Sequence, residues 1–147
     1  MNKIETTYLI KVDYSQSLQT MIKAGKYDWV NQNITEEKFP FVNTGIKTAK
    51  LQLVHLDRCA ANQEVAKEIE EQGFRAAELP WLLSLGAGYP DLRREFPIIA
   101  LGSFSVLPGG HYCVPCFREY WRGGRHLYLA LYGPTWSKDS RFLVACA

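Results

Sequence analysis

The sequence has few of the residues from which common enzyme and metal sites are built. It carries three histidines and four cysteines in 147 residues, and its formal net charge is only +2. So small a charge does not by itself imply a polyanionic partner. No apolar run approaches the ~18–20 residues that span a bilayer, and the first residues lack the apolar segment of a secretory signal. We therefore expect a cytoplasmic protein that does not enter a membrane.

Familiar catalytic and nucleotide-binding motifs are also missing. Gly86-Ala87-Gly88 lacks the third glycine and the Lys-Ser/Thr pair of a phosphate-binding loop. The residues around Gly102-Ser103 do not complete a Gly-x-Ser-x-Gly elbow. There is no His-Glu-x-x-His pair and no calcium-binding loop. These absences favour a protein that acts by binding rather than by catalysis, with no cofactor.

The composition is that of an ordinary globular chain. Hydrophobic residues make up 47% and charged residues 22% of the sequence, which excludes dominant disorder and low complexity. The length fits the ~100–200 residues of one domain. We expect residues 1–147 to form one compact domain with a substantial core.

Periodicity and turn residues predict both strands and helices. Strands are expected over 7–14, 46–56, 98–101, 112–120, 125–132 and 141–146. Helices are expected after Ser15 up to Gly25, from a cap at Asn62 to Gln72, and from Glu78 to the Gly86–Gly88 run, with one more turn at 91–95. This order predicts an α+β fold in which the helices pack on one face of a mixed sheet and the C-terminal strands form an antiparallel β-meander.

Three segments resemble a small bacterial family of single-domain proteins. They are Lys26-Tyr27-Asp28-Trp29-Val30, the run from Tyr89 to Ser103, and Arg141-Phe142-Leu143-Val144. The resemblance covers nearly the whole chain and implies a bacterial, single-domain protein. It brings no activity, ligand or catalytic residue.

The Cys113-Val114-Pro115-Cys116 motif has the spacing of a redox pair or of half a zinc site. A redox pair needs its first cysteine at a helix N-terminus, whereas this motif falls in a predicted strand. Side chains three apart on a strand point to opposite faces, so the two sulfurs are expected to diverge. Zinc needs further ligands, for which His111 is the nearest candidate. The favoured interpretation is two buried thiols and no metal site.

A second cluster with catalytic residue types is His55-Leu56-Asp57-Arg58-Cys59, at the end of the second long strand. Asp13 ends the first strand, so both ends would open on one edge of the sheet if the strands were parallel neighbours. Cysteine, histidine and aspartate can together form a nucleophilic site. Asp57 as a turn residue is the simpler interpretation.

The third cluster surrounds a predicted hairpin turn at Arg122-Gly123-Gly124-Arg125. Tryptophan, tyrosine and arginine are the residues that dominate protein interfaces, and they also stack on bases and contact phosphates. The candidate binding residues are Arg118, Tyr120, Trp121, Arg122 and Arg125, with Trp136 from a later loop.

Three functions remain open at this stage. We expect a non-catalytic domain that binds a protein partner or a second copy of itself through the hairpin. The first alternative is a nucleic-acid-binding module that uses the same arginines and aromatic rings. The second is a small enzyme or zinc protein that uses the cysteines and histidines.

Overall fold

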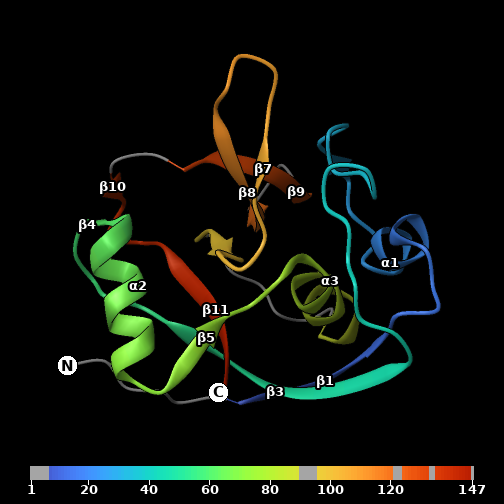
Figure 1. Cartoon of the computed structure of the whole chain (residues 1–147), viewed down its shortest axis with the longest axis horizontal. Coiled ribbons are helices and arrows are strands. Elements are labelled where there is room, and N and C mark those ends of the chain that lie inside the picture. Colours follow the sequence, from blue (N-terminus) through green and yellow to red (C-terminus); the bar gives the residue numbers. More distant parts are fainter. Residues whose placement is uncertain (1–6, 90–95, 121–123, 133–134, 147) are drawn as a thin grey trace.

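The computed structural model describes residues 7–89, 96–120, 124–132 and 135–146. Its helices are α1 (Leu18–Ala24), α2 (Asn62–Glu71) and α3 (Leu79–Gly88). Its longer strands are β1 (Tyr8–Asp13), β3 (Ile46–Val54), β8 (Tyr112–Tyr120), β9 (Gly124–Leu131) and β11 (Arg141–Cys146). Short strands are β2 (Trp29–Val30), β4 (Ala60–Ala61), β5 (Phe74–Ala76), β6 (Ile98–Ile99), β7 (Ser105–Val106) and β10 (Thr135–Trp136). The predicted α+β class is confirmed (Figure 1).

The main sheet is mixed and has the order β1-β3-β11-β6-β8-β9-β2. β5 joins β11, and β7 joins β8, beside this path. β11 runs parallel to β6 and antiparallel to β3, so the C-terminal strand lies inside the sheet. The predicted C-terminal meander is therefore confirmed for two of its three strands. β8 and β9 form an antiparallel hairpin, but β11 pairs with strands from earlier in the chain.

The helices do not share one face of the sheet, contrary to the sequence prediction. α1 and α3 pack into one apolar cluster, which contains Leu51, Phe117 and Leu143 from the sheet. α2 packs into a second cluster, which contains Val54 and Val144. Neighbouring residues of one strand thus enter different clusters, because successive side chains alternate across a sheet. We call these the α3 side and the α2 side; Figure 1 shows the helices so divided.

α3 is the centre of the larger cluster. Its apolar side chains lie on all sides of the helix and nearly all are buried, as expected of a helix enclosed in a core. Ser103 Oγ accepts a hydrogen bond from the Leu79 N–H at the start of α3. The helix continues through Gly86 and Gly88, although these glycines were expected to end it. The turn predicted at 91–95 lies outside the described residues.

Candidate binding surface

The β8–β9 hairpin determines which predicted residues can act together. Arg118 lies opposite His126, and Glu119 lies opposite Arg125. Cross-strand neighbours project to the same face of a sheet. Because Cys116 and Tyr128 belong to the cluster of the α2 side, Arg118, Tyr120 and His126 project to that side also. Arg125 projects to the α3 side.

An aromatic series runs across the α2 side near the turn. The ring centroids of Tyr120 and His126 are 4.8 Å apart, and those of His126 and Trp29 are 5.8 Å apart. The Arg118 guanidinium carbon lies 4.8 Å from the Tyr120 ring centroid. Trp29 is 48% exposed and Tyr120 is 38% exposed. We call the surface formed by Trp29, Arg118, Tyr120 and His126 the aromatic face.

The charge on the aromatic face comes from Arg118. Its Nε atom is buried and has no hydrogen-bond partner, and among the described residues its side chain has no carboxylate partner. Tyr128 lies further along the same side, and its burial raises the pKa of its hydroxyl well above the usual range. A cation held against the Tyr120 ring, opposite His126 on the neighbouring strand, is suited to bind an anionic group next to apolar surface.

Arg125 instead points into the molecule. Its Nε donates to the Gly25 carbonyl, its terminal nitrogen donates to the Gly86 carbonyl at 2.9 Å, and Glu119 lies 3.5 Å away. The guanidinium also lies 4.8 Å from the Phe117 ring centroid. Arg125 and Glu119 are each 14% exposed. Arg125 thus links β8 and β9 to α1 and α3, and it does not contribute to the aromatic face.

The other predicted binding residues are dispersed. Trp136 is buried in the cluster of the α2 side, and its indole N–H donates to the Asn62 side chain. It contacts Tyr132 and Phe142 and not the aromatic face. Trp121 and Arg122 lie outside the described residues. Of the six predicted binding residues, the structure places Arg118 and Tyr120 together on a surface.

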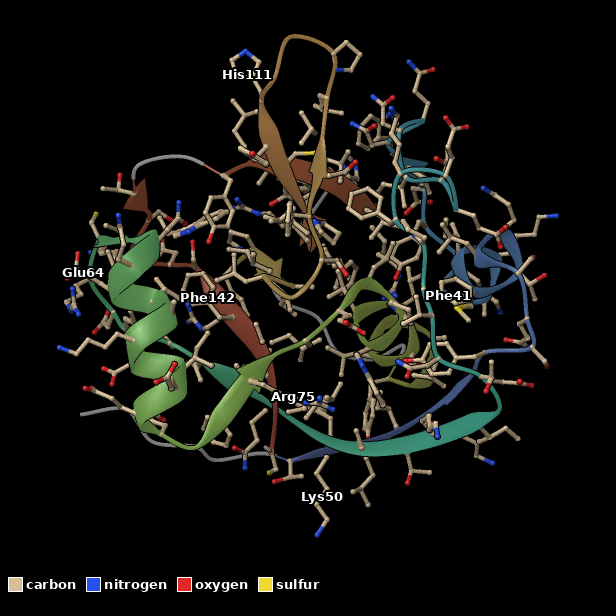
Figure 2. All side chains as sticks on the ribbon, in the orientation of Figure 1. Phe41, Lys50, Glu64, Arg75, His111 and Phe142 are labelled. Atoms are coloured by element: carbon tan, nitrogen blue, oxygen red, sulfur yellow. The ribbon has the colours of Figure 1, made fainter. Side chains whose placement is uncertain are left out.

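The two cysteines of the Cys113–Cys116 motif lie on opposite sides of the sheet. Cys113 belongs to the cluster of the α3 side and Cys116 to that of the α2 side, so the sulfurs diverge as the strand geometry predicts. Burial raises the pKa of both thiols, which disfavours the thiolate needed for redox chemistry or zinc. His111 lies at the far end of the β7–β8 connection (Figure 2). Across the described ranges, no group of three His, Cys, Asp or Glu side chains could hold a metal ion.

The second cluster is not assembled as the sequence predicts. β1 and β3 are antiparallel, and Asp13 lies opposite Ile46 at the start of β3. Asp13 is therefore at the end of the sheet remote from His55, whereas the prediction placed the two at one edge. His55 Nε2 lies 2.7 Å from the Lys138 carbonyl oxygen and 3.7 Å from an Asp57 carboxylate oxygen. Asp57 has a positive φ of 58°, as befits its role in a turn.

Sequence reasoning missed Trp29 and His126 as members of the surface. β2 is two residues long and pairs in parallel with β9, which brings together segments that are far apart in the chain. No local periodicity marks so short a strand. The one available signal was compositional, since Trp29 is a large aromatic residue in an irregular, polar segment.

Comparison with known proteins gives no functional evidence: no protein-family model, curated protein or solved structure matches the chain. In the part of the chain that the structure describes, no helix is both long enough and apolar enough to cross a membrane. The function is therefore argued from the geometry of the surface.

Proposed function

We propose that the protein is a non-catalytic binding domain whose aromatic face holds an acidic segment of a partner protein. The observation that carries this proposal is Arg118, an arginine without a carboxylate partner among the described residues. It is placed over Tyr120 and opposite His126, whose ring lies near that of exposed Trp29. An acidic group on a partner protein would supply the carboxylate that the described residues do not. Its fork matches a carboxylate, and the rings supply apolar contact area around it.

A protein partner fits this surface better than nucleic acid does. Nucleic-acid binding requires several cations that follow successive phosphates. Arg118 is the permanent cation of the aromatic face, and His126 is the other basic side chain. Trp, Tyr and Arg together are typical of the centre of a protein interface, where few residues supply most of the binding energy.

Selection of random peptides from a display library on the immobilised protein tests the proposal. Enriched peptides should contain Asp or Glu next to an apolar residue, and their affinity should be measured by fluorescence anisotropy. Trp29→Ala and Arg118→Glu should each weaken binding by about 2 kcal/mol or more, roughly 30-fold. Lys23→Glu makes the same charge change on α1, on the other side of the sheet, and should leave the affinity unchanged.

Three results would contradict the proposal. Enriched peptides could bind Trp29→Ala and Arg118→Glu as tightly as the natural chain, which would place the interface elsewhere. A single-stranded oligonucleotide could bind tightly with a steep dependence on salt, which would indicate a nucleic-acid module. The natural chain could be a dimer that dissociates in Trp29→Ala and in Arg118→Glu, which would show that the aromatic face binds a second copy of the chain.

A further inference from the structure

A second concave surface lies on the α3 side of the sheet, between α3 and strands β1, β3 and β11. It has a volume of about 660 Å³ and opens to solvent. Small-molecule sites commonly have volumes of ~300–1,000 Å³. Because the aromatic face lies on the α2 side, this hollow is a separate site, and its argument does not depend on the proposed function.

The register of the strands explains why the hollow exists. Ala49 lies opposite Ile10, and Ala145 lies opposite Leu51 on one side and Arg75 on the other. These side chains project to the α3 side, where two alanines leave room that larger residues would fill. The floor is therefore apolar, with the small side chains of Ala49 and Ala145 at its lowest part.

One wall is aromatic and the other carries a charge. Trp81 of α3 lines the hollow and is itself buried at 7% exposure. Arg75 of β5 also lines it, and Figure 2 shows its side chain on the inner side of the sheet, whereas Lys50 points away on the outer side. Among the described residues, no side-chain hydrogen bond or ion pair engages Arg75. The described lining residues include no Asp or Glu.

We propose that this hollow binds a small organic carboxylate with a flat apolar body. The carboxylate would pair with the Arg75 guanidinium, and the body would lie on Ala49 and Ala145 against Trp81. A single arginine fork matches the two oxygens of a carboxylate. A flat ring is suited to this space because one wall is an indole and the floor is a pleated surface of small side chains.

Two probes of nearly equal shape, one charged and one neutral, distinguish the contribution of the carboxylate charge to binding from that of the apolar ring. Calorimetry should detect binding of 2-naphthoate at millimolar or lower concentration, and neutral 2-naphthamide should bind at least tenfold more weakly. In ¹H–¹⁵N spectra, addition of 2-naphthoate should change the chemical shifts of the backbone amides of Ile10, Ala49 and Ala145 the most. Arg75→Gln should weaken naphthoate binding at least tenfold and leave naphthamide unchanged. Ala49→Leu fills the floor and should abolish binding of both.

Matched variants control for folding and for the aromatic face. Lys23→Gln removes an equal charge on α1, and Ala66→Leu adds the same volume at an exposed position of α2; neither should change naphthoate binding. Arg118→Glu should also have no effect. The proposal is overturned if naphthoate does not bind, if naphthamide binds equally well, or if Arg75→Gln and Ala49→Leu bind as the natural chain does. It is also overturned if the shifts centre on Tyr120 and His126.

Discussion

Arg118 and Arg125 belong to one hairpin but have different roles, because strand pairing directs their side chains to opposite sides of the sheet. Arg118 is paired with His126 and projects with it to the α2 side, where both are half-buried, whereas Arg125 is paired with Glu119 and is turned into the core. The sequence places both in a run of arginines and aromatic residues where they look equivalent. A buried guanidinium must have each of its donors satisfied, and Arg125 meets this need with two carbonyls and a carboxylate.

Replacement of this core arginine should be costly. Arg125→Gln removes the cation that lies 3.5 Å from the nearly buried Glu119 and deprives the Gly25 and Gly86 carbonyls of a donor. The free energy of unfolding should fall by about 2–4 kcal/mol, as measured by urea denaturation. Arg118→Gln, the matched change at a half-buried arginine whose buried Nε has no hydrogen-bond partner, should cost about 1 kcal/mol or less. Equal losses in the two variants would show that Arg125 is not a core residue.

At the scale of single elements, the start of α2 differs from the sequence prediction. Asn62 was expected to cap the helix, but Ala61 is the N-cap and the Asn62 side chain accepts the Trp136 indole N–H. Glu64 compensates in part, since one of its carboxylate oxygens accepts from the Ala61 N–H and the other pairs with Arg58. Both contacts lower the pKa of the Glu64 carboxyl below its usual value, and the hydrogen bond from Ala61 has the larger effect.

The uncapped start of α2 offers a stabilising substitution. Ala61 already has the extended backbone of an N-cap residue, with φ −75° and ψ 161°. Ala61→Ser would add an oxygen that accepts a backbone N–H of the first turn and should raise the free energy of unfolding by about 0.5–1 kcal/mol. The reverse change is Ser17→Ala at the natural N-cap of α1, which removes the hydrogen bond from the Thr20 N–H. It should lower the free energy of unfolding by a similar amount. A thermal midpoint for Ala61→Ser below that of the natural chain would contradict this reading of the helix start.

At the scale of the whole molecule, the sheet separates two apolar clusters, and each contains a buried tyrosine hydroxyl. Tyr27 packs against the cluster of the α3 side and Tyr128 against that of the α2 side. Burial raises the pKa of both hydroxyls well above the ordinary value near 10. Each therefore holds its proton more tightly in the folded state than in the unfolded state.

This difference predicts alkaline unfolding. The stability linked to these tyrosines is fully present below pH 10 and is lost as the pH rises above 10, where the unfolded chain releases its tyrosine protons. Tyr27→Phe removes one such group and a buried hydroxyl without a hydrogen-bond partner, so it should retain more stability than the natural chain at pH 11. Urea denaturation at pH 7, 9 and 11 measures this. If the free energy of unfolding fell equally with pH in Tyr27→Phe and in the natural chain, Tyr27 would not be a source of the alkaline unfolding.

The sequence was sufficient for features that depend on neighbours within a few residues. Alternation predicted β1, β8, β9 and β11 nearly to their observed ends, and Gly25 marked the end of α1. The predicted cap at Ser15 was wrong, because Ser17 caps α1 and Ser15 bonds to the Asp13 side chain instead. The divergence of Cys113 and Cys116 followed from the same period of two. These features are local because backbone geometry fixes side-chain direction along one strand or helix.

Only the tertiary structure decided which elements meet. The position of β11 between β3 and β6, the division of helices between two faces, and the approach of Trp29 to His126 join segments that are far apart in the chain. These pairings bury apolar side chains from separate segments together, and α3, which is apolar on all sides, lies enclosed in one of the two clusters. The register of β8 and β9 turned Arg125 toward the α3 side and Arg118 toward the α2 side, and two alanines on neighbouring strands left the hollow beside Arg75. These are collective results of packing, so no single segment encodes them.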